Sequence, residues 1–444
     1  MKIIIVGSGS AGLMTALMLN NNIPDVEILI IRSKFKKIIG VGESTVGTFN
    51  TMLVDLLGMD KNDFIINVKP VTKYGISFEF GKDEFHYTFD TVFDYEFYNE
   101  KLPIGFKFNG GNYGNSEFST NMINNSNAYK YNSGGYHIDN GLFIDYLEKI
   151  CQKRGIKFIN DDIISVEREG DNIVSLNEKY VSDYFIDCSG FKPLLSKSKF
   201  YSYEDVLVND RALFFRTKTT DTLKPYTQAT TMNCGWLWRI DHSTGFSGNG
   251  YVYSSKYITD EEAKKEVEQK LKIKLEDSRI IPFKTGRLEK HWVGNVITVG
   301  NSDGFVEPLE ATSLMTILQL SKDFSQIIKY GDNKGDLINR YNDFTNIYYD
   351  NIRDFILLHF CFNKRKDTKY WSDYRKRVNK LNRDSQTYEI LDHYLNNDVH
   401  IKYLSQINEL SNPFGYEGYF SILRGLIPTD DDRKELLTIL NDNI

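Results

Sequence analysis

The first twelve residues constrain the fold more than any other part of the chain. The sequence opens with "MKIIIVGSGSAGLMTALMLNN", in which glycines at positions 7, 9 and 12 lie between an apolar strand-length stretch and an apolar helix-length stretch. A lone GxGxxG pattern is weak, but a strand before it and a helix after it are typical of a dinucleotide-binding turn. Gly7 permits the tight turn, Gly9 lets the backbone approach a pyrophosphate, and Gly12 lets helix and strand pack closely. The helix N-terminus then faces the phosphates, so we predict a Rossmann-like α/β fold that binds a dinucleotide.

The end of the second predicted strand leaves the identity of the dinucleotide open. This strand, "VEILIIRS", should end in an acid that holds the adenosine ribose, but Arg32 stands there. An arginine at this place accommodates the 2'-phosphate of NADP or stacks on adenine. Two later strands, at 184–190 and 295–305, also end in turns of small residues that can approach a cofactor. Their order after the N-terminal motif favours a discontinuous FAD domain over a compact NADP domain.

Composition excludes several classes of protein. The net charge is -6 over 444 residues with acids and bases mixed along the chain, so no general attraction to nucleic acid or anionic lipid is expected. No apolar run approaches the ~20 residues that span a bilayer, and the N-terminus lacks a signal-peptide layout. The four cysteines are isolated, without metal-binding spacing. We expect a cytoplasmic protein without a metal site, and we interpret the basic, aromatic segment 363–377 as a solvated surface.

The segment "NVKPVTKYGISFEF", residues 67–80, predicts a strand that carries an unexplained lysine. One face holds Tyr74, Ile76, Phe78 and Phe80, and the other holds Lys73, Gly75, Ser77 and Glu79. The alternation by itself predicts a half-buried strand with Lys73 on its wet face, as is usual for lysine.

Three further segments are weak signals when each is taken alone. "GVGEST" (40–45) is a second glycine-rich turn, and "GWLWRI" (235–240) places Trp236 and Trp238 on one face of a predicted strand. "EPLEATS" (307–313) precedes a long predicted helix. Tryptophans two residues apart are more often core than site, and an acidic segment before a helix is more often a cap.

Together these segments resemble the flavin-dependent tryptophan halogenase family. The match includes GSGSAG, GVGES, FIDCSG, GWLWRI, NGYVYSS and VEPLEATS and extends from residue 1 to roughly 375. The resemblance implies a glutathione-reductase-type FAD-binding domain, an inserted β-sheet substrate domain and a helical C-terminal part. The expected boundaries are 1–60, 130–200 and 285–330 for the FAD domain, 61–129 and 201–284 for the substrate-side sheet, and 331–444 for the helical region.

The resemblance also implies an activity. Such an enzyme uses FADH2, O2 and a halide ion to form hypohalous acid, which halogenates an electron-rich aromatic or indole small molecule. A separate flavin reductase would supply FADH2, because no second dinucleotide motif is visible; a homo-oligomer stays possible. The family's lysine falls on Lys73, which would hydrogen-bond the oxidant or carry it as a haloamine. Glu310 would orient the oxidant and take the ring proton, and the amides of Thr312 and Ser313 would bind the halide.

The cofactor-binding residues implied by the motifs lie in four segments. They are Gly7, Gly9, Ser10, Ala11, Gly12, Arg32, Gly42, Glu43, Ser44, Asn301 and Leu314.

Several departures from the family pattern bear on function. Ser313 replaces a glycine, Asp241 follows Ile240 where the motif has proline, and Arg32 replaces the ribose-binding acid. The segment 393–420 lacks the tyrosine-tyrosine-acid pattern that grips the tryptophan backbone, so free tryptophan is not the expected substrate. Two alternatives stay open: a flavin-dependent aromatic monooxygenase, which would need neither Lys73 nor the paired tryptophans, and a catalytically silent flavin-binding protein.

Overall fold

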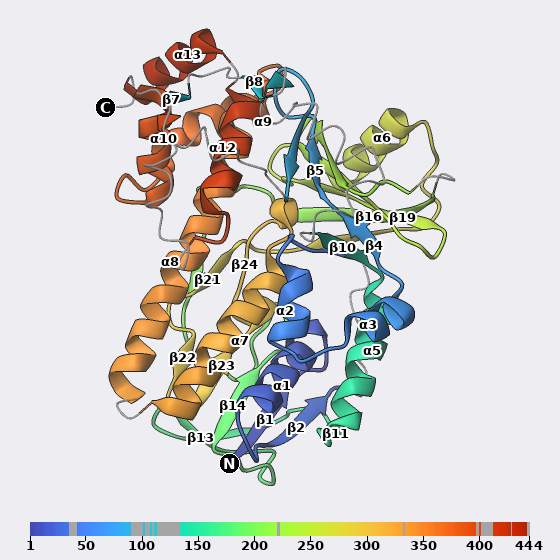
Figure 1. The fold of residues 1–444 in the computed structure, drawn as a ribbon, viewed down its shortest axis with the longest axis vertical. Helices are drawn as coiled ribbons and strands as arrows, with labels where there is room; N and C mark the ends of the chain where they lie inside the picture. Colours follow the sequence, from blue (N-terminus) through green and yellow to red (C-terminus); the bar gives the residue numbers. More distant parts are fainter. Residues whose placement is uncertain are drawn as a thin grey trace. The chain divides into compact units, whose positions relative to one another are not determined.

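The computed structural model divides the chain into two compact units (Figure 1). It describes residues 1–34, 42–89, 134–219, 223–331, 334–396, 412–427 and 429–441, with short strands at 101–102, 107–108, 111–112 and 399–400. The first unit comprises Met1–Pro70, Tyr136–Ser202 and Thr285–Tyr349. The second comprises Val71–Gly135, Tyr203–Lys284 and Asp350–Ile444.

The first unit is built on a six-stranded, mostly parallel sheet in the order β11-β2-β1-β14-β23-β22. The strands are β1 (Lys2–Val6), β2 (Glu27–Arg32), β11 (Lys157–Asn160), β14 (Tyr184–Asp187), β22 (Trp292–Val293) and β23 (Val296–Thr298). Only the edge strand β22 runs antiparallel to its neighbour. The central strands are buried on both faces, and therefore consist of continuous apolar runs such as that of β1.

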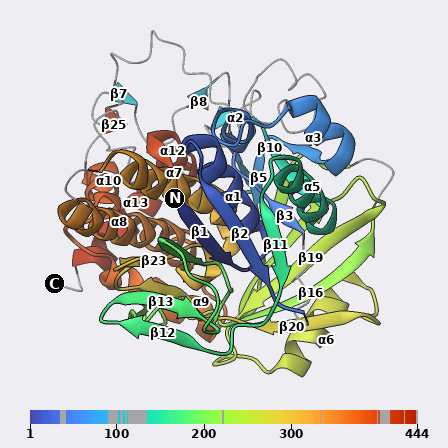
Figure 2. The same cartoon turned by 90° about the horizontal axis from the view of Figure 1, so that it is seen from below.

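The two faces of this sheet are covered differently. Ile3 and Ile5 of β1 pack in a core with helices α1 (Ser10–Asn22), α5 (Asn140–Lys153) and α7 (Ser313–Tyr330). Ile4 and Val6 pack on the opposite face, in a core shared with β13 of the hairpin β12 (Val166–Glu169) and β13 (Asn172–Leu176). Figure 2 shows α1 and the hairpin on opposite sides of the sheet. This arrangement confirms the predicted Rossmann-like α/β architecture.

Short elements complete the first unit. Strand β3 (Glu43–Ser44) pairs with the end of β10 (Gly135–Ile138). The short helices are α2 (Phe49–Asp55) and α3 (Lys61–Val68), and the 3-10 turns are η4 (Gly300–Ser302) and η5 (Pro308–Glu310). A small sheet is formed by β15 (Phe200–Ser202), β21 (Gly286–Leu288) and β24 (Gly304–Phe305). The two 3-10 turns lie between β23 and α7 in the sequence, where the resemblance places site residues.

The second unit contains a seven-stranded sheet in the order β20-β16-β19-β18-β17-β5-β6. Its strands are β5 (Gly75–Phe78), β6 (Phe85–Thr88), β16 (Arg211–Lys218), β17 (Thr227–Met232), β18 (Gly235–Asp241), β19 (Phe246–Tyr253) and β20 (Ser278–Pro282), and β4 (Val71–Lys73) precedes them. Helix α6 (Asp260–Leu271) starts at a capping box formed by Thr259 and Glu262, and it packs on the sheet through Ala263 and Val267. A sheet is therefore present in this part of the chain, as predicted, and it includes the tryptophan strand β18.

The C-terminal part is helical, as expected. Its helices are α8 (Lys334–Cys361), α9 (Lys369–Arg375), α10 (Gln386–Asn396), α12 (Gly415–Leu426) and α13 (Asp430–Asn441). Within the second unit, α9 is anchored by Trp371, whose indole Nε1 donates to the carbonyl of Met232 at 2.8 Å. The aromatic residues of the basic segment 363–377 thus point into the core while Lys369 is exposed. None of the described helices is both long and apolar enough to cross a membrane.

Candidate active site

Gly7 and Gly12 of the first turn have the structural roles that the sequence predicts, and Gly9 faces open space. Gly7 has a φ of +116°, and a Cβ there would lie 2.2 Å from the carbonyl oxygen of Cys188. A Cβ on Gly12 would lie 2.0 Å from the carbonyl oxygen of Gly7, so only glycine lets α1 pack this closely. A Cβ on Gly9 would meet no atom within 4 Å. The turn is therefore closed on its protein side and open at Gly9, which fits the approach of a pyrophosphate to the N-terminus of α1.

Three turns meet at the carboxyl edge of the parallel sheet. The turn after β14 joins the one after β23, because the Gly190 amide donates to Ser302 Oγ at 2.9 Å. Gly300 has a φ of +70°, and a Cβ there would lie 2.8 Å from Cβ of Ala11. Ligands of open α/β sheets bind at this edge. The structure thus places the predicted cofactor residue Ala11, in the first turn of α1, against the turn that contains the predicted residue Asn301.

The guanidinium of Arg32 is committed to partners within the first unit. Its Nη1 lies 2.8 Å from Glu148 Oε1 on α5, and its Nε donates to Asn160 Oδ1 at 2.5 Å. The group also lies 5.5 Å from the ring centroid of Phe158. A paired arginine is less available to a 2'-phosphate than a free one would be, so the contacts favour FAD over NADP at this position.

Glu43 of the second glycine-rich turn is linked to the first turn by a residue that sequence reasoning missed. Ser10 Oγ donates to Asn140 Oδ1 at 3.3 Å, and Asn140 Nδ2 donates to Glu43 Oε1 at 3.3 Å. Burial raises the pKa of Glu43 to about 7. The predicted residues Ser10 and Glu43 are therefore parts of one polar chain. Gly40 and Val41 of the same motif lie outside the described residues.

The segment that ends in α7 makes a sharp turn next to Glu310. Glu310 is buried at the end of η5, and Ala311 follows with a φ of +56°, a conformation that is uncommon for residues other than glycine. Thr312 is the N-cap of α7, and its side chain caps none of the first amides of that helix. Thr312 and Ser313 thus lie at a helix N-terminus, as predicted, and Leu314 is buried behind them. Such a terminus favours an anion.

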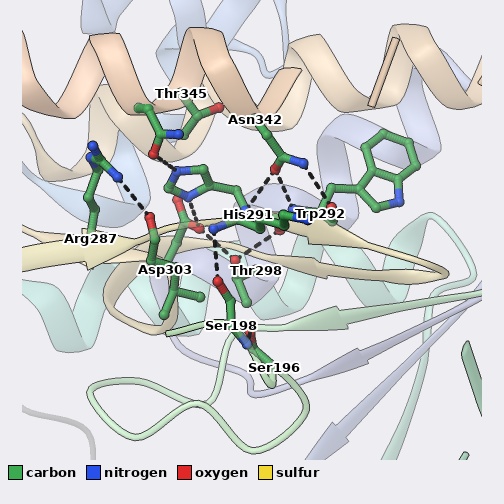
Figure 3. Close-up of polar contacts among 12 residues, drawn as sticks. Ser196, Ser198, Arg287, His291, Trp292, Thr298, Asp303, Asn342 and Thr345 are labelled. Carbon is green, nitrogen blue, oxygen red and sulfur yellow. Dashed lines mark hydrogen bonds and ion pairs between the residues drawn. The ribbon is translucent and has the colours of Figure 1, made fainter. Parts of the chain in front are cut away.

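A buried histidine network supports this region, and nothing in the sequence pattern pointed to it (Figure 3). His291 Nδ1 lies 2.6 Å from Asp303 Oδ1, and Thr298 Oγ1 donates to the same oxygen at 2.5 Å. The amide of Asp303 donates to the carbonyl of Gly300 at 2.9 Å, which closes η4. Asn342 on α8 accepts from the backbone amide of His291 at 2.8 Å. The network therefore fixes the turn after β23.

Lys73 is fully buried in the second unit, with 0% of its surface exposed. Its Nζ lies 4.9 Å from the ring centroid of Phe89, within the range of a cation–π contact. The predicted wet face of this strand is wrong, because Gly75 and Ser77 are buried as well. Lysine is rarely buried without a specific role, so the structure excludes a simple solvated charge.

The paired tryptophans lie on β18 of the second unit, as predicted. Trp236 is buried, and Trp238 stacks on Phe214 of β16 at a centroid distance of 6.1 Å. A Cβ on Gly250 of β19 would lie 2.4 Å from the indole of Trp238, so glycine there makes room for the ring.

Asp241, which stands where the motif has proline, is buried, and its carboxylate accepts hydrogen bonds from three groups. It accepts from Ser247 Oγ at 2.6 Å, the Lys224 amide at 2.9 Å and Arg239 Nε at 3.0 Å. Burial alone would raise the pKa of Asp241, but these hydrogen bonds and the arginine charge outweigh it and hold the pKa below its usual range.

Comparisons with known proteins identify the family. The model of the tryptophan halogenase family matches residues 2–392. Tryptophan 7-halogenase RebH of Lentzea aerocolonigenes is 28% identical, and the alignment covers 96% of this chain and 89% of RebH. Tryptophan 6-halogenase SttH of Streptomyces toxytricini is 31% identical over 55% of this chain and 49% of its own length.

Solved structures show the same fold. The lanthipeptide tryptophan 5-halogenase MibH superposes with a TM-score of 0.83 at 27% identity, covering 100% of this chain and 90% of MibH. The flavin-dependent halogenase BrvH of Brevundimonas sp. BAL3 superposes with a TM-score of 0.79 at 24% identity, covering 100% of this chain and 94% of BrvH. The family match extends over the glycine turn, the buried lysine, the paired tryptophans and the EPLE segment, and the chain belongs to the tryptophan halogenase family of flavin-dependent halogenases.

Proposed function

We propose that this halogenase acts on an electron-rich aromatic or indole substrate and that Lys73 is its catalytic lysine. The observation that carries the proposal is the complete burial of Lys73, the residue on which the sequence resemblance places the family's lysine. When bound, reduced FAD together with O2 supplies the oxidising equivalent that converts halide to hypohalous acid. The open Gly9 turn and the N-terminus of α1 would hold its phosphates.

Lys73 suits either of two roles toward the oxidant. As an ammonium it has three donors and would orient hypohalous acid by hydrogen bonding, and the face of Phe89 stabilises this charged form. As a neutral amine it would attack the halogen of hypohalous acid, release water and carry the halogen as a haloamine. Both roles need a lysine kept away from bulk water, into which the oxidant would otherwise escape before it meets the substrate.

Glu310 supplies a base for the last step. When an electrophilic halogen adds to an aromatic ring, the carbon that accepts it must lose a proton to restore aromaticity. A buried carboxylate is a suitable acceptor, and the left-handed turn at Ala311 fixes the backbone next to Glu310.

We propose that the halide is held by the backbone amides of Thr312 and Ser313, at the N-terminus of α7. Such amides bind an anion through dipoles and hydrogen bonds, and they discriminate poorly by size. Bromide and iodide are less hydrated and more easily oxidised than chloride. Turnover with bromide or iodide should therefore be at least equal to turnover with chloride.

Ser313→Gly, which restores the glycine typical of the family, should shift this preference. The ratios of kcat/KM for chloride, bromide and iodide check the prediction, and Ser313→Ala separates the loss of the hydroxyl from the added backbone freedom. Strict chloride selectivity that is unchanged in both variants would remove Ser313 from the halide site.

The substrate should differ from free tryptophan. The curated relatives RebH and SttH are named for tryptophan, yet segment 393–420 lacks the amino acid clamp. Much of that segment lies outside the described residues. Tryptophan should compete weakly against simple indoles and phenols in a panel assayed with flavin reductase, FAD, NADH and each halide, with products identified by mass spectrometry. Tryptophan as the best substrate of the panel would contradict this prediction.

A further inference from the structure

We propose that Glu43 holds a proton at the cofactor site and that the binding of FAD is strongest when its carboxyl is neutral. The inference rests on the proposed binding of FAD at the GxGxxG turn, and it does not depend on halogenation. The protonation state of Glu43 would thereby set the affinity of the protein for FAD.

The position of Glu43 is the first support. Asn140 uses both ends of its side-chain amide, accepting from Ser10 Oγ and donating to Glu43 Oε1, each at 3.3 Å. Ser10 is the first residue of α1, whose N-terminus would face the phosphates. The carboxyl therefore lies within two side-chain hydrogen bonds of the phosphate-binding end of the helix.

The charges around Glu43 are the second support. No lysine or arginine among the described residues forms an ion pair with Glu43, and α1 carries no titratable side chain. On β10, His137 lies opposite Ser44, beside Glu43. Asp139 is the N-cap of α5 and is occupied with the amides of that helix, while Asp145 is exposed. Within the described part of the chain, a carboxylate at position 43 would therefore lack a paired cation, and burial raises the pKa of Glu43 to about 7.

The sign of the linkage follows from the charge of the ligand. The pyrophosphate of FAD is anionic, so it disfavours an ionised Glu43 and raises the pKa of that carboxyl further in the complex. Below about pH 7 the carboxyl is already neutral and affinity should not depend on it. Above that pH the free protein loses the proton and binding must restore it, so affinity should fall by up to about tenfold per pH unit until the higher pKa of the complex is reached.

The test is a titration of the full chain with FAD at about pH 6 and about pH 9, followed by flavin fluorescence. The wild-type Kd should rise by roughly tenfold, whereas Glu43→Gln, which keeps the hydrogen-bond acceptor, should change by less than about twofold. Glu289→Gln is the control, since it removes an exposed acid of the same unit that makes no contact with the predicted cofactor residues, and it should keep the wild-type pH dependence. Equal pH dependence in wild type and Glu43→Gln would overturn the proposal.

A second measurement needs no variant. Calorimetry at about pH 8 in two buffers of different ionisation enthalpy counts the protons that FAD binding takes up. The wild type should take up a substantial fraction of one proton, and no uptake would overturn the inference. Because neither measurement uses turnover, an enzyme that binds FAD with proton uptake but forms no halogenated product would contradict the proposed function and leave this inference standing.

Discussion

Lys73→Met is expected to lower the rate of halogenation by about 10²–10⁴-fold while the affinity for FAD stays at the wild-type value. Methionine is unbranched and of similar length, so it fills the buried site without a large cavity but offers neither a charge nor a nucleophile. FAD binding should persist because the glycine turn belongs to the first unit and Lys73 to the second. Product formation and the Kd for FAD are measured on the same preparation.

Lys224→Met is the matched control for Lys73→Met. Lys224 is a half-buried lysine of the same unit, and its Nζ donates to Gln228 at 2.8 Å. This variant should halogenate at close to the wild-type rate. If Lys73→Met retained more than about a tenth of wild-type turnover, Lys73 would not be a catalyst of this reaction.

Lys73→Arg separates the two roles that the structure allows for the lysine. Arginine keeps a positive charge and several donors, but it stays protonated and is a poor nucleophile. Substantial activity in this variant would favour the hydrogen-bonding role, and loss of activity in a folded protein that still binds FAD would favour the haloamine.

Glu310→Gln should lower the halogenation rate by about 10²–10⁴-fold, because the amide keeps the shape of the side chain but cannot accept the ring proton. Loss of that proton should then limit the rate. A substrate deuterated on the ring should therefore react measurably more slowly than the protonated one in the variant, and to a smaller extent in the wild type. Glu289→Gln, at an exposed glutamate of the same unit, is the control and should behave as wild type. A wild-type rate in Glu310→Gln would remove the carboxylate from the mechanism.

Local sequence motifs were sufficient to predict most of the fold and part of the candidate site. The GxGxxG turn was predictable because the structural reason for each glycine is local. Gly7 has a positive φ, Gly9 leaves space for a ligand to approach, and Gly12 contacts the carbonyl of Gly7. The start of α7 at Ser313 was predictable for the same reason, since the apolar periodicity of the helix begins there.

Contacts between distant segments could not be predicted in this way. Asn140 joins Ser10 and Glu43, which lie 130 and 97 residues away from it along the chain, and no local pattern encodes that bridge. The His291–Asp303 pair depends on a turn whose geometry appears only when the sheet is assembled.

The burial of β5 is another such case. The alternation along this strand suggested one wet face, but its residues are covered on both sides. Ser77, for example, lies on the face that was expected to be wet, yet it is fully buried and its Oγ donates a hydrogen bond to the carboxylate of Glu84. Whether both faces of a strand are buried depends on the neighbouring strands and on the helices that pack on the sheet. The sequence of the strand itself does not contain this information.

The most direct test of the whole account is the mass of the product formed by the wild-type chain with a flavin reductase, FAD, NADH and bromide on a simple indole. Halogenation predicts a product with the mass doublet of bromine that disappears when bromide is omitted. A product heavier by one oxygen, formed equally with and without bromide, would identify a monooxygenase and contradict the account.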